Sequence, residues 1–116
     1  MYARVWKLGI LPGKAEEFAI AAKSAIPVLR RQAGFRSLLV LRGGPGERLE
    51  ATVVSVWDSL IALRDSETSA FQQVLTRVLT FCEHRPSMRE EEVLVNEFAS
   101  SDPTDTIDLD DTVTKF

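Results

Sequence analysis

The chain has few of the residues that carry metal or redox chemistry. Its 116 residues include one cysteine, Cys82, and one histidine, His84. A single cysteine excludes an internal disulfide and fits a reducing compartment, so we expect a cytoplasmic protein. One Cys and one His cannot supply the usual ligands of a zinc site. No phosphate-binding loop is visible either, and we expect neither a metal nor an organic cofactor.

The sequence also lacks a long apolar run and a basic surface. No stretch approaches the about 20 apolar residues of a membrane helix, and the N-terminus enters a strand-like pattern with no sign of a signal peptide. The net charge is −3, but residues 100–116 hold five aspartates against one lysine. The rest of the chain is therefore nearly neutral, without a basic footprint for nucleic acid. We expect neither a nucleic acid nor a membrane as partner.

The length suits one domain that can bury its own hydrophobic core. A hydrophobic fraction of 45% is ordinary for a globular protein. We predict a domain over residues 1–99 and an acidic C-terminal tail or arm over residues 100–116. In the tail, Ile107 and Leu109 alternate with aspartates. This period of two indicates an extended, half-buried segment that packs on the body or on a second protomer.

Hydrophobic periodicity predicts the order strand, helix, strand, strand, helix, strand. Apolar residues at steps of three and four indicate helices beginning near Lys14 and Ser69, and Pro27 should kink the first of them. Asp58 or Ser59 can cap a short helical turn before the second long helix. The predicted strands span residues 2–10, 35–42, 49–57 and 91–98, and the second long helix spans residues 69–83.

This order is typical of an α+β, ferredoxin-like βαββαβ fold with a four-stranded antiparallel sheet and both helices on one face. Such a sheet should alternate apolar and polar residues if its other face is wet. The segments 38–41, 53–54 and 93–95 are instead apolar on both faces. Because burial of each aliphatic side chain contributes about 1.5–3 kcal/mol, we predict a homodimer in which the helix-free sheet faces pack together.

Three motifs resemble the antibiotic-biosynthesis monooxygenase family. They are Pro12-Gly13-Lys14 before the first helix, Arg30-Arg31-Gln32-Ala33-Gly34-Phe35 before the second strand, and Val56-Trp57-Asp58-Ser59 after the third. The resemblance covers residues 2–98 and implies a dimeric α/β barrel with a cavity between sheet and helices in each protomer. Members include cofactor-free oxygenases of phenolic polyketides, quinol monooxygenases, haem-degrading enzymes, isomerases and proteins without known activity. The fold therefore does not determine the chemistry.

The haem-degrading branch of the family has its own residue requirements. It needs an Asn on the first strand, seven residues before the Gly of the turn, where this chain has Trp6. It also needs a His on the second helix, whose apolar face here presents Phe71, Leu75 and Leu79. The resemblance therefore predicts that this chain does not degrade haem.

Three of the candidate site residues lie on the first predicted strand, and two lie later in the chain. Cofactor-free oxygenation needs a dry site that lets a phenol lose its proton and stabilises the anion. Alternation places Tyr2, Arg4 and Trp6 on one strand face, which the resemblance turns toward the cavity. We predict Arg4 and Trp6 as catalytic candidates, and Tyr2, Trp57 and His84 as substrate-binding candidates. Each has a structural alternative: core packing for the tryptophans, solvation for Arg4, and helix capping for His84.

Two functional classes follow from these residues. The first is a cofactor-independent monooxygenase acting on a small hydrophobic aromatic or phenolic compound of the quinol or polyketide kind. The second is a non-catalytic dimeric protein on the same α/β barrel that binds a small hydrophobic ligand or serves as an accessory protein. The absence of an evident acid–base pair favours the second class, and the activity common in the family favours the first. A large apolar cavity holding Arg4, Trp6 or Tyr2 would favour a site.

Overall fold

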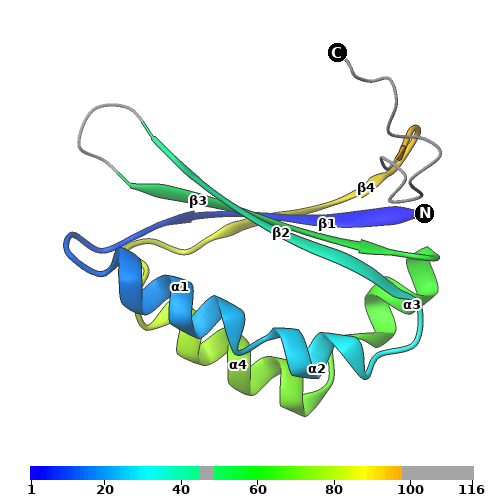
Figure 1. Ribbon diagram of the computed structural model, residues 1–116, viewed down its shortest axis with the longest axis horizontal. Coiled ribbons are helices and arrows are strands. Elements are labelled where there is room, and N and C mark those ends of the chain that lie inside the picture. Colours follow the sequence, from blue (N-terminus) through cyan, green and yellow to red (C-terminus); the bar gives the residue numbers. More distant parts are fainter. Residues whose placement is uncertain (45–48, 98–116) are drawn as a thin grey trace, which may run out of the picture.

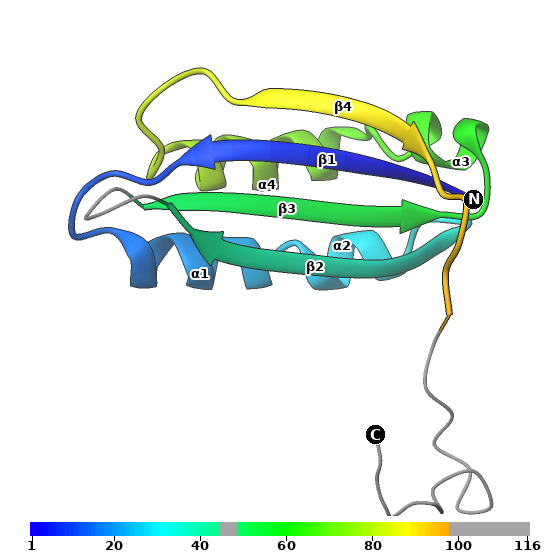
Figure 2. The same cartoon turned by 90° about the horizontal axis from the view of Figure 1, so that it is seen from above.

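A computed structural model describes residues 1–44 and 49–97. Figures 1 and 2 show an α+β fold with two layers, in which the helices cover one face of a twisted sheet. The elements in chain order are β1 (Tyr2–Gly9), α1 (Ala15–Lys23), α2 (Ile26–Arg30), β2 (Phe35–Gly43), β3 (Glu50–Trp57), α3 (Leu60–Asp65), α4 (Ser69–Leu79) and β4 (Ser87–Glu92). None of the helices in the described ranges is long and apolar enough to span a membrane.

The four strands form one antiparallel sheet in the order β2-β3-β1-β4. β1 therefore lies between β3 and β4, and its Tyr2 is paired with Trp57 on one side and Glu92 on the other. Figure 2, seen from above the sheet, shows the helical layer lying behind all four strands. This arrangement confirms the predicted ferredoxin-like fold.

The first predicted helix is interrupted rather than kinked. α1 ends at Lys23 and α2 begins at Ile26, with Pro27 in the first turn of α2. Proline is tolerated at that position because the N–H groups of a first helical turn have no partner within the helix. Ser24 supports the break, since its hydroxyl donates to the Ala21 carbonyl at 2.5 Å. Leu29 on α2 still reaches the core, with 3% of its surface exposed.

Side-chain caps fix the start of each helix on the other half of the layer. The Ser59 hydroxyl accepts from the Ala62 N–H at 3.1 Å and begins α3, so Ser59 rather than Asp58 is the cap. Thr68 begins α4 in the same way by accepting from the Phe71 N–H at 3.2 Å. α4 ends at Leu79, four residues before the predicted end.

The fourth strand was predicted at the wrong place. It spans Ser87–Glu92 instead of residues 91–98, because pairing with β1 and not an apolar pattern decides its position. The apolar residues that suggested a strand follow it, and the side chains of Leu94 and Val95 are 86% and 85% exposed. Val93 remains tied to the N-terminus through its N–H, which donates to the Met1 carbonyl at 2.9 Å.

The sheet has a helix face and an open face, and β2 and β3 carry apolar side chains on both. Direct partners in an antiparallel sheet share a face, which places Leu38 and Val40 on the helix face and Leu39 and Leu41 on the open face. Val54 pairs with both Leu39 and Val5 and so belongs to the open face. Leu39 and Leu41 are 54% and 48% exposed in the single chain. The prediction of two-faced apolar strands is confirmed for β2 and β3.

Some sequence predictions fall outside the described residues. The proposed arm of the tail, including Ile107 and Leu109, lies there, as does part of the glycine-rich loop that includes Pro45. The division into a domain over residues 1–99 and a tail therefore stays a prediction.

Candidate functional site

A pocket lies between the sheet and the helical layer and holds Arg4 and Trp6. It is a cavity of about 60 Å³, enough for a few water-sized groups and smaller than the several hundred Å³ of a typical ligand site. Its lining comes from β1, β2, β3, α1, α2, α4 and the α3–α4 turn. The lining residues are Arg4, Trp6, Leu8, Ala22, Ala25, Leu29, Leu38, Val40, Val53, Ser55, Trp57, Ser66, Phe71, Val74, Leu75 and Val78.

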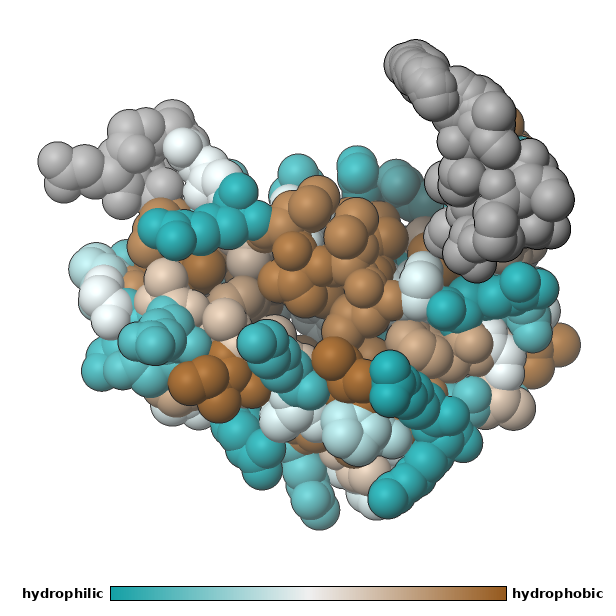
Figure 3. Space-filling view, in the orientation of Figure 1, coloured by the Kyte–Doolittle hydropathy of each residue, from teal (hydrophilic) through white to brown (hydrophobic). Residues whose placement is uncertain are grey.

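A second, larger hollow adjoins this pocket. It is a groove of about 330 Å³ between α1 and the edge strand β2. Both hollows are walled by Ala22, Leu38 and Val40. Figure 3 shows apolar surface gathered over β2 in the middle of this side of the molecule, with a hollow between it and the helical layer. The groove therefore forms an apolar approach from solvent to the pocket.

Arg4 is the central polar group of the pocket, and only 2% of its side chain is exposed. Its Nη2 donates to Glu67 Oε2 at 2.6 Å and to the Leu63 carbonyl at 3.4 Å. Glu90, its direct partner on β4, has a carboxylate oxygen 3.9 Å from Nη2. Arg4 Nε is buried and has no hydrogen-bond partner in the described part of the chain. A buried donor of this kind favours an oxygen acceptor beside it.

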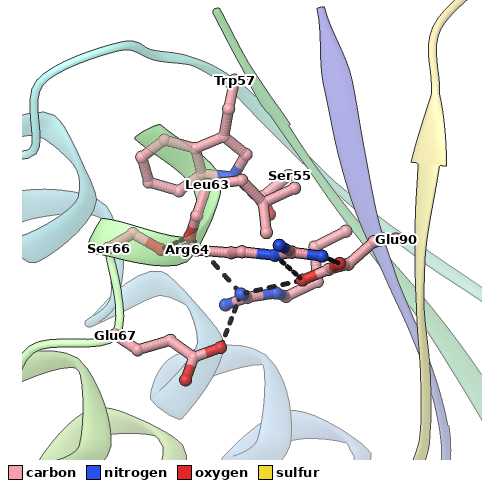
Figure 4. A network of polar contacts seen from close by, with 8 residues as sticks. Ser55, Trp57, Leu63, Arg64, Ser66, Glu67 and Glu90 are labelled. Carbon is pink, nitrogen blue, oxygen red and sulfur yellow. Dashed lines mark hydrogen bonds and ion pairs between the residues drawn. The ribbon is translucent and has the colours of Figure 1, made fainter. Parts of the chain in front are cut away.

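The network continues from Glu90 to the surface through Arg64 (Figure 4). Arg64 Nη2 donates to Glu90 Oε1 at 2.9 Å. This hydrogen bond holds the pKa of Glu90 below its ordinary value, and the nearby positive charge of Arg4 adds to the effect. The same contact raises the pKa of Arg64. Figure 4 shows Glu67 and Glu90 approaching the network from different elements. The contacts follow the order Glu67, Arg4, Glu90 and Arg64, so carboxylates and guanidiniums alternate, and the buried Arg4 lies between partly exposed groups.

Trp57 lines the pocket at the end of β3, with 1% of its surface exposed. Its Nε1 donates to Ser55 Oγ at 2.9 Å (Figure 4). The ring meets Phe35 edge to face, with ring centroids 5.3 Å apart, a favourable geometry for aromatic pairs. The indole N–H that made Trp57 a candidate donor is therefore occupied by Ser55, and the ring contributes apolar wall.

The other candidates are not gathered at Arg4. Tyr2 lies on the helix face, where it packs against the core without lining the pocket. His84 is 78% exposed, with Nε2 3.7 Å from Glu83 Oε1, and it borders a different hollow beside Gly9 and Pro12. Cys82 donates to the Val78 carbonyl at 3.5 Å, and burial raises the pKa of its thiol. The structure thus brings together Arg4, Trp6 and Trp57 and leaves Tyr2 and His84 apart.

A comparison with known protein families identifies the family of this chain. The family model described as antibiotic biosynthesis monooxygenase matches residues 1–76. The chain belongs to this family. A comparison with curated protein sequences finds no match.

Solved structures share the fold of this family member at low sequence identity. A protein from Caulobacter crescentus assigned to the antibiotic biosynthesis monooxygenases is 20% identical, with a TM-score of 0.69 over 81% of this chain and 90% of that one. SnoaB, a cofactor-independent oxygenase from Streptomyces nogalater, is 16% identical, with a TM-score of 0.68 over 82% and 95%. A protein of unknown function from Nitrosomonas europaea is 17% identical, with a TM-score of 0.68 over 85% and 94%. These similarities concern the fold.

Sequence reasoning missed the polar residues that hold Arg4 in this monooxygenase-family chain. Glu90 lies just outside the fourth strand as predicted over residues 91–98, and the register of β1 with β4 places it beside Arg4. Only a correct position of β4 could have shown this. Glu67 reaches Arg4 from the α3–α4 turn, 63 residues away along the chain, and no local pattern marks it. Ser55 was in principle visible, because alternation puts it on the same strand face as Trp57.

Proposed function

We propose that this protein is a cofactor-independent monooxygenase acting on a small hydrophobic aromatic or phenolic compound at the Arg4 pocket. The observation that carries the proposal is the buried guanidinium of Arg4, whose Nε has no partner among the described residues, in a pocket whose lining is mostly apolar. A positive donor in a dry environment stabilises an oxygen anion much more than the same donor in water. A phenolate is the anion that such chemistry requires.

Each pocket residue has a role in this proposal. Arg4 donates to the phenolate oxygen, while Glu67 and Glu90 hold its guanidinium in place. Neither carboxylate lines the pocket, so in this proposal the phenol proton reaches the partly exposed Glu67 through water. Trp6 and Trp57 supply flat apolar walls for an aromatic ring. The apolar lining keeps water away from the anion.

The reaction needs only molecular oxygen as co-substrate. The phenolate gives up an electron to oxygen, and the two radicals combine at a ring carbon para to the phenolate oxygen. The resulting hydroperoxide loses water and leaves a carbonyl, so that a phenol becomes a quinone. One oxygen atom enters the product and the other leaves as water, with both hydrogens coming from the substrate.

The size of the pocket sets a condition on this reaction. A ring compound exceeds a cavity of about 60 Å³, so the substrate must also use the neighbouring groove of about 330 Å³. Leu38 and Val40 on β2 lie between the two hollows. Their side chains must move aside for a ring to occupy both. β2 is an edge strand, and β3 is its one strand partner among the described residues, which makes such a displacement less costly than one at the sheet centre.

Oxygen consumption tests the proposal. The purified protein is mixed with 1-naphthol or anthrone, in which the carbon para to the oxygen carries hydrogen, in the presence of a metal chelator, and oxygen uptake and quinone formation are followed. We expect turnover above the uncatalysed rate, and a loss of about 100-fold or more in kcat/KM for Arg4→Gln, with Arg30→Gln as an exposed matched control. Activity that requires added flavin or metal, or that Arg4→Gln leaves unchanged, would contradict the proposal.

A specific observation supports a second candidate, a non-catalytic ligand-binding protein. The guanidinium charge of Arg4 is already balanced by Glu67 at 2.6 Å, and the Trp57 N–H is already donated to Ser55. Among the described lining residues Arg4 is the one side chain with a titratable group, so no base lines the pocket directly. Tight binding of 1-naphthol or anthrone without oxygen uptake would favour this candidate.

We propose further that two copies pack through their open sheet faces. The apolar side chains of Leu39 and Val54 supply the contact surface in this proposal, and Leu39 is 54% exposed in the single chain. An exposed apolar sheet face of this kind marks an interaction surface. A second copy of the same face is its natural partner, because a two-fold interface is self-complementary.

A further inference from the structure

The groove beside the pocket carries charge of one sign at its mouth. Its described lining is apolar except for Lys23 and Arg42, and it contains no carboxylate. The apolar part consists of Ile10, Phe18, Ala19, Ala22, Ile26, Leu38, Val40, Leu41 and Ala51. Lys23 stands in the last turn of α1 and Arg42 near the end of β2, so the two elements that form the groove each contribute one cation.

We propose that the groove recognises the acid group of an amphipathic aromatic carboxylate whose apolar body extends toward the Arg4 pocket. Both cations are exposed, and neither forms an ion pair with another residue of ranges 1–44 and 49–97. Their long stems can lie along the apolar wall while the charged ends remain in water. An anion at the mouth thus keeps part of its hydration and meets positive charge.

Charge complementarity selects this occupant over a neutral one. A neutral aromatic compound gains the apolar contacts of the groove and nothing from Lys23 and Arg42. An aromatic acid gains the same contacts and the attraction of two cations without any opposing carboxylate among the described lining residues. An ammonium compound would be repelled by the same pair.

The direction of the ligand follows from the shared wall. Ala22, Leu38 and Val40 line both hollows, so a body that leaves the cations and follows the apolar surface arrives at the pocket of Arg4. The inference deepens the proposed function, since it names an acidic substituent on the compound that the pocket would take. The anion at the mouth and the phenolate at Arg4 are then separate groups at opposite ends of one ligand.

A matched pair of fluorescent probes tests the inference. Anthracene carboxylate and anthracene methanol share an aromatic body, and only the first is charged at neutral pH. Their dissociation constants are measured for the unaltered protein, for the double variant Lys23→Gln/Arg42→Gln, and for Arg85→Gln, an exposed cation outside the groove lining. Circular dichroism checks that each variant is folded.

We expect the unaltered protein and Arg85→Gln to prefer the carboxylate by about five- to tenfold, as two partly solvated ion pairs provide. The double variant should lose this preference while its affinity for the alcohol changes less than about twofold. High salt should weaken binding of the carboxylate alone. An undiminished preference in the double variant, or its loss in Arg4→Gln instead, would overturn the inference, because the acid group would then sit at Arg4.

The outcome is separable from that of the proposed function. Binding of the carboxylate with the expected preference, together with no oxygen uptake from 1-naphthol or anthrone, would leave the groove inference standing and remove the oxygenase. Oxygen uptake with equal affinity for both probes would do the reverse.

Discussion

Arg4 Nη2 lies 2.6 Å from Glu67 Oε2, and this contact joins the centre of the sheet to the turn between α3 and α4. The two side chains differ greatly in burial, with 2% of Arg4 and 45% of Glu67 exposed. Water can therefore reach Glu67 but not the guanidinium that it balances. The contact matters mainly because it compensates a buried charge.

Glu67→Gln should lower the free energy of unfolding by about 1–2 kcal/mol. The substitution keeps the shape of the side chain but leaves the Arg4 cation buried with less compensation, and the half-exposed partner limits the loss. Glu17→Gln is a matched control, because Glu17 is also 45% exposed and its partner Lys14 is 48% exposed. An exposed pair of this kind is worth little. Equal unfolding midpoints in urea for the two variants would refute the argument.

Acid should weaken the fold partly through Glu90. Its pKa is lowered by the hydrogen bond from Arg64 relative to the ordinary value of 4.5, so the unfolded chain takes up this proton more readily than the folded one. The contribution is present above pH 4.5 and is lost as the pH falls through the lower pKa of the folded state. Urea unfolding at a series of pH values should show a smaller acid loss for Glu90→Gln than for the unaltered protein. An identical pH dependence would contradict this.

Gly34 occupies a position that only glycine fits. Its φ is +82°, and a Cβ there would lie 2.6 Å from the Cβ of Ala62. Gly34→Ala should therefore destabilise the protein by more than about 2 kcal/mol, through both backbone strain and the clash with α3. Gly13→Ala is the control, since φ is +74° there but nothing lies within 4 Å of the added carbon. It should cost about 1 kcal/mol; a cost as large as that of Gly34→Ala would show that the clash is unimportant.

The parts of the fold that sequence alone predicts are those with a strong local signal. Helical periodicity located the start of α4, and Ser59 was one of two possible caps for α3. The edge strand β4 has no such signal, because Ser87–Glu92 is mostly polar and exists through its backbone pairing with β1. The strand was therefore predicted too far along the chain, because the prediction relied on the apolar residues Leu94 and Val95.

The candidate site could likewise be predicted from the sequence only in part. Alternation along β1 correctly put Arg4 and Trp6 on one face, which is a local property of any strand. The partners of Arg4 could not be predicted, since Glu67 and Glu90 reach it from the α3–α4 turn and from β4. His84 was a candidate only because of its side-chain chemistry, and the fold places it beside another hollow. Contacts between distant segments are the information that a single sequence does not contain.

Val54→Asp should separate the proposed dimer, whereas Val40→Asp should not do so through the sheet interface. The sequence could not distinguish these two valines, and the register now does: Val54 pairs with Leu39 and Val5 on the open face, and Val40 pairs with Val53 on the helix face. A carboxylate in the centre of an apolar interface would be desolvated without a partner, at a cost of several kcal/mol. Ile61→Asp, on an exposed helical position with 73% of its surface accessible, controls for the added charge. Sedimentation at micromolar concentration should give a monomer for Val54→Asp and a dimer for Ile61→Asp and the unaltered protein, and a monomer for the unaltered protein would remove the proposed interface.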